Sequence, residues 1–355
     1  MLAGYLEKQG AQVAALTLGL AGDIEMSCAQ GVARALRFNH HTANLEFSLY
    51  PHFADLQLRW THLANGFNGV VGWSIHPHLR AISSRAVVGY VCDAIVGGSH
   101  ISWAYSPQNG GMSFDTFFSR INQWGIHPLQ ARRLLRKDIF GELVDETIDR
   151  IRSVYEGYSE HESRRAWCFD LHHRRRYHVG SAVWALSFGA WPIMPVVDRE
   201  MLATVAGIPA ASMADRRAQF ELVCTRFPDL AELNLDRNSF NFEPLRPRFR
   251  HLLATNLHIR FWEMLGMVGM NRGQPRKERR YYHRVANFNS PGWVAVRQLA
   301  EPHRERVAHL FNKGALDELL PRSDVPIRFE DPIRDASGIK ALLGFILWSR
   351  NCLWF

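Results

Sequence analysis

The sequence has few cysteines, and none is spaced for a metal site. Its 355 residues include five cysteines, an odd number, scattered without a C-x-x-C pair. This usage argues against a disulfide framework and against a cysteine zinc site, and it suits a reducing compartment. We therefore expect a cytoplasmic protein.

The sequence also lacks a leader and an uninterrupted apolar run of membrane length. The N-terminus, MLAGYLEKQG, carries charge early and has no long apolar core, so it is not typical of a signal peptide. Residues 179–197 are uncharged and follow three arginines, which is the pattern of a membrane span with basic flanks. Glycines and prolines interrupt this run at Gly180, Gly189, Pro192 and Pro195. We therefore predict a buried helix that ends in a proline-bounded loop, and no membrane partner.

What is present is the composition of a folded globular protein. The chain is 47% hydrophobic and 21% charged, and its 11 tryptophans and 21 phenylalanines can bury a large apolar surface. Disorder is therefore not expected. The net charge of +8 comes mostly from arginine, which binds phosphate and carboxylate groups bidentately. An anionic ligand and a solvated basic surface are both compatible with this charge.

The hydrophobic pattern predicts an α/β protein whose second half is mostly helical. Apolar runs of strand length occur at 12–20, 42–49, 69–75 and 86–91. Apolar residues recur at helical spacing at 2–9, in the segment that follows the N-cap Asp23, and at 53–63. This order predicts an open α/β sheet with parallel strands. Further helices are expected at 114–124, 129–136, 143–158, 160–176, behind the N-cap Asp198, and at 251–270. A turn-rich break at 238–248 suggests two domains, residues 1–240 and a helical, basic extension at 241–355.

The most informative stretch is 88–98, VGYVCDAIVGG. An apolar strand runs into a lone carboxylate, Asp93, and a glycine pair follows. An open α/β sheet presents ligand-binding groups in this way at the carboxyl ends of its strands. Aspartate oxygens suit the hard cation Mg²⁺, so Asp93 is a candidate metal ligand, and a turn or N-cap role is the alternative. Tyr90, in the same stretch, is either a core residue or a catalytic one.

Several segments, in order, resemble the synthetase domain of asparagine-synthetase-type enzymes. The first matches are LAGYL at 2–6, LTLGL at 16–20 and, after Asp23, VARAL at 32–36. The segment from Gly89 to Gly98 is similar to the family's G-E-G-S-D-E-x-x-G-G stretch, and PVVD at 195–198 to its P-F-L-D stretch. The resemblance covers about residues 1–235, a span that suits one large domain.

This resemblance implies an ATP-dependent carbon–nitrogen ligase, with ATP and Mg²⁺ as cofactors. Such enzymes adenylate a carboxylate with ATP and then attack the adenylate with an amine or ammonia. The implied fold is the open parallel sheet of the adenine-nucleotide α-hydrolase (Rossmann-like) type. Leu18 and Gly19 match the strand that lines the adenine pocket, Gly89 a glycine near the nucleotide, and Asp93 a magnesium ligand. Tyr90 lies where β-lactam-forming relatives carry a tyrosine, which makes it the catalytic candidate.

The sequence also departs from this family at its start. The S-G-G-x-D-S loop that cradles pyrophosphate is missing, and NGGMS at 109–113 lies too far downstream to replace it. The family's first strand would end before Met1, its N-terminal glutaminase is absent, and Ala94 replaces a second acidic residue. We therefore expect a domain truncated at its start, with weak or no ligase activity. Its partners would be a small-molecule or peptide carboxylate and a separate glutaminase or upstream segment. The alternative is a non-catalytic scaffold that keeps the fold, with a polysaccharide-biosynthesis role suggested by a resemblance at 279–297.

Two other features have simpler explanations. Residues 276–284, RKERRYYHR, mix cations with aromatic rings, as a nucleic-acid patch does. A basic surface run, or docking of an anionic nucleotide or polymer, accounts for them as well, and we expect no nucleic-acid partner. The histidines at 40–41, 76–78 and 172–178 have no defined ligand spacing, so we expect solvated or hydrogen-bonded side chains there.

Overall fold

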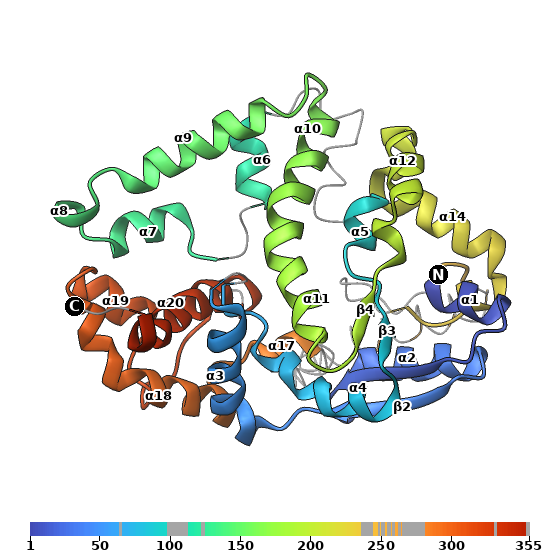
Figure 1. The fold of residues 1–355 in the computed structure, drawn as a ribbon, viewed down its shortest axis with the longest axis horizontal. Coiled ribbons are helices and arrows are strands. Elements are labelled where there is room, and N and C mark those ends of the chain that lie inside the picture. The colour runs from blue at the N-terminus through green and yellow to red at the C-terminus, as the bar shows by residue number, and fades with distance from the viewer. Residues whose placement is uncertain are drawn as a thin grey trace. The chain divides into compact units, whose positions relative to one another are not determined.

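The computed structural model describes residues 1–63, 66–97, 113–121, 125–235, 244–247, 281–329 and 332–352, and the positions 249, 253, 257, 260, 261 and 264. The protein is a mostly helical α/β protein with two small parallel sheets of two strands each, and neither sheet closes on itself within these ranges (Figure 1). No helix in this part of the chain has the length and apolar character needed to cross a membrane. The chain divides into two compact units, residues 1–45 with 218–285 and residues 46–217 with 286–355.

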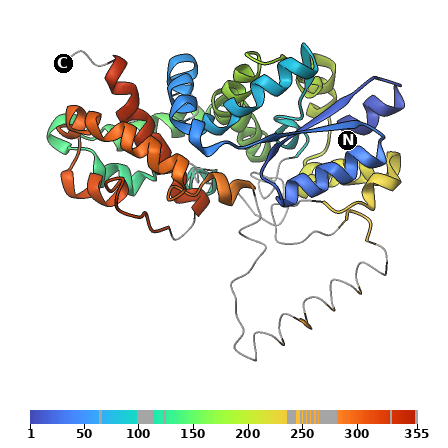
Figure 2. The ribbon, with the colours of Figure 1, turned by 90° about the horizontal axis from the view of Figure 1, so that it is seen from below.

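The first unit is built on a β-α-β segment. β1 (Ala14–Gly19) pairs in parallel with β2 (Asn39–Asn44), and the register places Gly19 opposite Asn44. α2 (Ile24–Ala35) connects the strands and packs against β1, with Ile24, Met26 and Ala33 buried (Figure 2). The predicted strand at 12–20 and the helix behind Asp23 are confirmed. The extended segment predicted at 42–49 is wrong in part, because the strand comes earlier and the 3₁₀ turn η1 (Phe47–Leu49) follows it.

Four short helices complete the description of the first unit: α1 (Leu2–Lys8), α14 (Arg217–Arg226), α15 (Pro228–Ala231) and α17 (Tyr281–Val285). The Tyr5 ring meets the Phe227 ring edge-on at 4.9 Å, and Lys8 Nζ donates to the Arg226 carbonyl at 2.7 Å. These contacts join α1 to the end of α14, although more than 200 residues separate them in the sequence. The helix predicted at 2–9 is confirmed. The predicted domain boundary at 240 and most of the predicted helix at 251–270 lie outside the described residues.

The sheet of the second unit is smaller than the sequence predicts. β3 (Arg85–Val87) pairs in parallel with β4 (Trp191–Ile193). The strand predicted at 86–91 therefore ends early, at Val87. The strand predicted at 69–75 is wrong, because Val70–Ile75 forms the 3₁₀ helix η2. Its buried residues, Val70, Val71, Trp73 and Ser74, recur at helical rather than alternating spacing, which explains why the apolar run folds as a helix.

Helices form the rest of the second unit. Before β4 these are α3 (Tyr50–Thr61), α4 (His76–Ile82), α5 (Cys92–Ile95), α6 (Phe114–Ile121), α7 (Pro128–Leu134), α8 (Lys137–Phe140), α9 (Leu143–Glu156), α10 (Glu162–Phe169), the π-helix η5 (Asp170–Val179) and α11 (Gly180–Leu186). After β4 come η6 (Pro195–Val197), α12 (Arg199–Ala206), α13 (Ala210–Met213), η7 (Ala214–Arg216), α18 (Pro291–Ala308), α19 (Lys313–Leu319) and α20 (Pro332–Cys352). The helices predicted at 53–63, 114–124, 129–136 and 143–158 are confirmed over their described residues, although three of them end two residues early, at Thr61, Leu134 and Glu156.

Aromatic rings fill the core where α3, α18 and α20 pack together. Trp293 is fully buried and stacks on Phe288 at 4.5 Å, with Tyr50 edge-on at 5.6 Å. The approach of α18 to η1 and α3 requires a glycine, since a Cβ at Gly292 would lie 2.7 Å from the Phe47 carbonyl oxygen of η1 and 2.8 Å from the Tyr50 ring of α3. Burial of these rings supplies much of the apolar stabilisation of this part of the unit.

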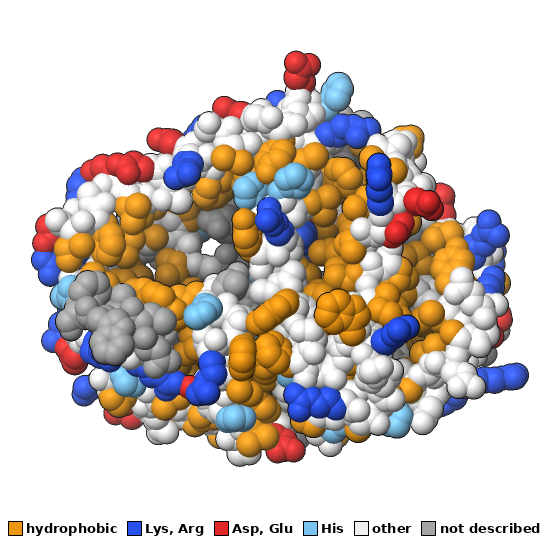
Figure 3. All heavy atoms as spheres, in the orientation of Figure 1, with side chains coloured by type: hydrophobic (Ala, Val, Ile, Leu, Met, Phe, Trp, Pro, Cys, Tyr) orange, Lys and Arg blue, Asp and Glu red, His pale blue; other side chains and the backbone are white. Residues whose placement is uncertain are grey.

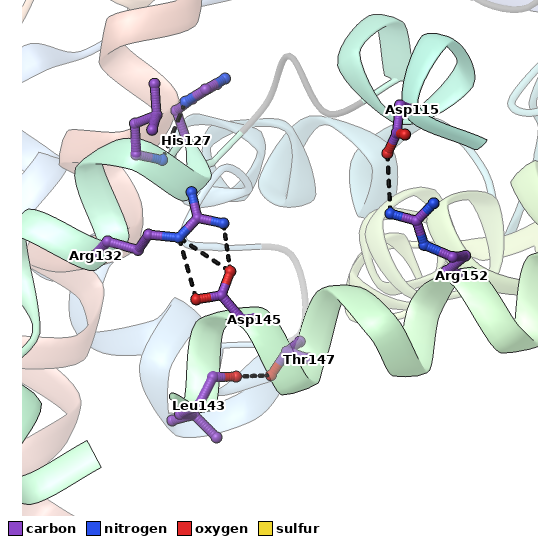
Figure 4. A network of polar contacts seen from close by, with 8 residues as sticks. Asp115, His127, Arg132, Leu143, Asp145, Thr147 and Arg152 are labelled. Carbon is purple, nitrogen blue, oxygen red and sulfur yellow. Dashed lines mark hydrogen bonds and ion pairs between the residues drawn. The ribbon is translucent and has the colours of Figure 1, made fainter. Parts of the chain in front are cut away.

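Surface ion pairs and caps join α6, α7 and α9, as Figure 4 shows. Arg132 of α7 donates from Nε and Nη2 to the Asp145 carboxylate of α9, at 3.1 and 2.5 Å. Arg152 of α9 donates to Asp115 of α6 at 3.1 Å, and the His127 ring caps the start of α7. These side chains are largely exposed, so each pair contributes little to stability.

The charged helix predicted at 160–176 lies within one continuous helical run. α10, η5 and α11 follow one another as a single column in Figure 1. The prediction is confirmed as a helix from Glu162, but the ten residues Asp170–Val179 form a π-helix rather than an α-helix. The run continues into the segment 179–197, where the predicted buried helix is wrong in part. Val183 and Leu186 of α11 are buried, but Trp184 is exposed, and β4, with Trp191 exposed, follows instead of a loop. Hydrophobic side chains lie at the surface in this part of the unit (Figure 3).

Candidate functional site

Leu18 and Gly19 lie at the carboxyl end of β1, in the first unit. Leu18 is half-buried opposite Ala43 of β2, and the Gly19 carbonyl accepts a hydrogen bond from Leu45 N at 3.3 Å. A Cβ at Gly19 would lie 3.0 Å from Asp23 Oδ2, so the glycine leaves room for that carboxylate. The end of β1 and the start of α2 thus meet in a tight turn, as at the ligand-binding edge of parallel sheets.

Asp23 holds this turn together. It occupies the predicted N-cap position of α2, but its side chain makes no capping hydrogen bond. Its carboxylate is 1% exposed, accepts from Leu20 N at 2.6 Å and lies 3.2 Å from Arg284 Nε. Glu25 adds a second link to α17, because its Oε2 accepts from Tyr281 N at 3.2 Å. Two carboxylates at the start of α2 therefore fix the distant segment 281–285.

Gly89, Tyr90 and Asp93 lie in one turn of the second unit, between β3 and α5. Cys92 N donates to the Gly89 carbonyl at 3.3 Å, and Val91 has a φ of +58°, a left-handed conformation that costs energy for a β-branched residue. Asp93 lies in the first turn of α5. The prediction that a strand runs directly into this carboxylate is therefore wrong, since five residues separate Val87 from Asp93. Gly98 of the predicted glycine pair lies outside the described residues.

Arginines surround Asp93. Its Oδ1 lies 3.5 Å from Arg175 Nη1 and its Oδ2 lies 4.0 Å from Arg216 Nη2. Arg175 is 7% exposed, and its Nε donates at 2.9 Å to Asp170, which is fully buried. Arg174 Nη1 lies 3.8 Å from the same Asp170 carboxylate. We call these five residues, Asp93, Asp170, Arg174, Arg175 and Arg216, the arginine cluster; its formal charge is +1.

Backbone strain gathers beside the arginine cluster. Asp215 and Arg216 both have positive φ, +51° and +61°, at the kink between η7 and α14. Gly97 has a φ of +93°, and a Cβ there would lie 1.9 Å from the Met213 carbonyl oxygen. The loop after α5 therefore packs directly on the backbone of α13. Consecutive strained residues of this kind concentrate at functional sites in proteins.

Two groups of the turn, the Tyr90 phenol and the Cys92 thiol, are held in their neutral forms. Desolvation raises the pKa of Tyr90, although 42% of its surface is exposed, so its phenol stays protonated at neutral pH. Burial, with the nearby Asp93 charge, raises the pKa of the Cys92 thiol. Tyr90 can therefore donate a hydrogen bond but is a poor base, and Cys92 is a poor nucleophile.

The sequence reasoning missed Asp170, Arg174, Arg175 and Arg216. The run of three arginines at 174–176 is visible in the sequence, but it was interpreted as part of a charged helix and as the flank of an apolar segment. Only the packing of η5 against α5 shows that Arg175 reaches Asp93. Trp167 supports the same contact, because its Nε1 donates to the Ala94 carbonyl at 3.0 Å.

A protein-held Mg²⁺ finds little support at Asp93. Among the described residues, no three histidine, cysteine, aspartate or glutamate side chains gather as metal ligands would. Asp93 is a single carboxylate, and two guanidinium groups already face it. The chemistry of this donor set suits an anion better than a dehydrated divalent cation. A magnesium role for Asp93 therefore stays a prediction.

Comparison of the sequence with protein-family models gives no match, and neither does comparison with curated proteins. The predicted site residues fall in different units of the chain. Leu18 and Gly19 lie in the first unit, and Gly89, Tyr90 and Asp93 lie in the second.

Proposed function

We propose that this chain is a synthetase-type domain of an ATP-dependent, amide-forming ligase similar to asparagine synthetase. The observation that carries the proposal is the parallel β1-α2-β2 unit, whose first strand ends in the Leu18–Asp23 turn. A nucleotide-binding half of a Rossmann-like sheet has this construction, with the ligand at the carboxyl ends of the strands. The parallel pair β3 and β4, followed by the Asp93 turn, supports the same adenine-nucleotide α-hydrolase type of sheet.

The proposed reaction has two steps. A substrate carboxylate oxygen attacks the α-phosphorus of ATP, and the bond to pyrophosphate breaks. An amine or ammonia then attacks the acyl carbon, the bond to AMP breaks, and the amine loses a proton to a base. Leu18 and Gly19 of the first unit would line the nucleotide site. Tyr90, which stays protonated, would donate a hydrogen bond rather than accept the proton.

Nucleotide binding by the full 355-residue chain tests this proposal. We expect calorimetry to detect ATP binding in the presence of Mg²⁺ and to show Asp93→Asn binding Mg·ATP at least about tenfold more weakly, about 1.4 kcal/mol, because the variant loses the carboxylate that the family resemblance assigns to Mg²⁺. Asp149→Asn, an exposed carboxylate on α9, is the matched control and should leave binding unchanged. Carboxylate-dependent exchange between ATP and pyrophosphate should be weak. A folded chain that binds no ATP at millimolar concentration contradicts the proposal.

The second candidate function is a non-catalytic scaffold that retains the synthetase fold. The pairing of Asp93 with Arg175 and Arg216 favours it, because a carboxylate held by two guanidiniums is less available to a metal ion. A chain that binds ATP with an affinity insensitive to Asp93→Asn, and that shows no exchange with pyrophosphate, would fit this function. Loss of Mg·ATP binding in Asp93→Asn would argue against it.

A further inference from the structure

The π-helix η5 gathers two adjacent arginines on one face. Asp170 and Arg175 are five positions apart and are joined by a 2.9 Å hydrogen bond, while Arg174, four positions from Asp170, lies 3.8 Å from it. In an α-helix with 3.6 residues per turn, positions five apart point about 140° away from each other. The wider i→i+5 turn of the π-helix removes this separation. Arg174 and Arg175 therefore share one buried carboxylate, which an α-helix would not allow.

The arginine cluster has more donors than acceptors. Within the described part of the chain, the enclosed atoms Arg174 Nη1 and Arg175 Nη2 have no hydrogen-bond partner, and neither has Asp170 Oδ1, which lies 3.8 Å from Arg174 Nη1. Arg175 is more than nine-tenths buried, so water solvates it poorly. A buried guanidinium nitrogen without a partner is costly, and an anion that accepts its hydrogen bonds would remove the cost. Desolvation lowers the pKa of Arg174, and the neighbouring Arg175 lowers it further, as expected for cations that lack sufficient negative charge.

We propose that Arg174 and Arg175 of η5, with Arg216 beside them, form a binding subsite for an oligophosphate anion at the Asp93 turn. Phosphate oxygens accept two hydrogen bonds from one guanidinium, and several phosphate groups can engage several arginines at once. The side chains of Asp93 and Arg216 are each 30% exposed and give the subsite an open side. The proposed function enters this inference only as the source of the ligand. The anion would be the phosphates of ATP or the pyrophosphate that the reaction releases.

Titration of the full chain with inorganic pyrophosphate, without Mg²⁺, tests the subsite. Calorimetry reports binding. We expect Arg174→Gln and Arg175→Lys to weaken pyrophosphate binding at least about tenfold, because the first removes a charge and the second removes the fork of donors. We expect Asp93→Asn to tighten it several-fold, since the competing carboxylate loses its charge. Arg176→Gln is the matched control: Arg176 is the next residue on η5, but it is exposed and lies over the Tyr177 ring.

The variants also show where the proposal fails. Arg175→Lys alters the partner of the buried Asp170, so thermal melting checks that this variant folds. If it does not fold, Arg174→Gln decides the outcome, since the Arg174 side chain is 17% exposed. Wild-type protein that binds no pyrophosphate at millimolar concentration overturns the subsite. The subsite is also overturned if Arg176→Gln and Arg174→Gln lose pyrophosphate affinity equally.

The subsite and the proposed function can fail separately. If ATP binds but Arg174→Gln changes neither ATP nor pyrophosphate affinity, the subsite is overturned and the proposed function stands. If pyrophosphate binds in an arginine-dependent way but ATP neither binds nor competes, the subsite stands for free oligophosphate and the nucleotide function fails. AMP, which has a single phosphate, should compete at least about tenfold more weakly than ATP, in line with fewer charge-assisted hydrogen bonds.

Discussion

A single buried lysine in the second unit makes stability depend on alkaline pH. Lys340 of α20 is 9% exposed, and its Nζ lies 5.6 Å from the centre of the Trp293 ring. Burial lowers its pKa from 10.5 to about 8. The unfolded state binds this proton more tightly than the folded state. The contribution of Lys340 to the free energy of unfolding is therefore least favourable below about pH 8, and it becomes more favourable as the pH rises from about 8 to 10.5. The pKa difference corresponds to roughly 3 kcal/mol, partly offset by the ring.

We expect Lys340→Met to stabilise the protein by about 1–3 kcal/mol at pH 7, since the buried charge is removed. The rise in stability between pH 8 and 10 should flatten in this variant. Urea unfolding at pH 7, 9 and 10 measures both effects. Lys313→Met, which changes an exposed lysine at the start of α19, should behave like wild type. A variant that keeps the wild-type pH dependence would show that Lys340 is not its source.

Sequence reasoning succeeded for residues whose role is local. Asp198 was predicted as an N-cap, and its carboxylate accepts from Glu200 N at 2.9 Å and Met201 N at 3.4 Å. The partners of a cap lie two or three positions away, so spacing alone identifies it. Asp170 and Lys340 could not be found in this way, because their burial depends on elements that are distant in the sequence.

At the scale of elements, the loop after α5 can approach α13 only because residue 97 is glycine. Its φ of +93° strains any other residue, and a Cβ would lie 1.9 Å from the Met213 carbonyl oxygen, which belongs to the backbone. We expect Gly97→Ala to lower stability by at least about 2 kcal/mol, through strain and forced movement of α13. It should also weaken pyrophosphate binding, because α13 leads into Arg216. Thermal unfolding and titration measure the two effects.

Gly125→Ala is the control variant for this prediction, because it introduces backbone strain without a steric contact. Gly125 has a φ of +107°, but a Cβ there would meet no atom within 4 Å. It should therefore show only the strain, about 1 kcal/mol, with pyrophosphate affinity unchanged. Equal losses of stability in the two variants would mean that the contact with α13 contributes nothing.

The types of most long elements could be predicted, but their local geometry could not. The helices at 53–63 and 143–158 have clear periodicity, and both are present in the structure. The apolar run at 69–75 was mistaken for a strand, because a short run has no period long enough to separate the two structures. The π-helix is invisible to periodicity, since its wider turn is stabilised by the buried pairing of Asp170 with Arg175.

At the scale of the whole molecule, each compact unit is assembled from two separate stretches of sequence. The first unit combines residues 1–45 with 218–285, and the second combines 46–217 with 286–355. The break predicted near 240 came from turn composition, which marks where the chain changes local structure. It carries no information about which distant segments pack together. Long-range links such as Asp23 with Arg284 set the composition of a unit, and sequence spacing does not show them.

The Asp23–Arg284 link therefore offers a test of the unit as a cooperative element. Asp23→Asn keeps an acceptor for Leu20 N but removes the charge that faces Arg284. Arg284 is 30% exposed, so we expect a loss of about 1–2 kcal/mol rather than the larger cost of a fully buried pair. Hydrogen exchange should become faster in β1, α2 and residues 218–235, and should not change in α3 and α18 of the second unit. Asp198→Ala, which removes the cap of α12, should show the reverse distribution, with about 1 kcal/mol lost. Faster exchange throughout the chain in both variants would mean that the two units unfold together, whereas opposite distributions would show that the two units unfold separately.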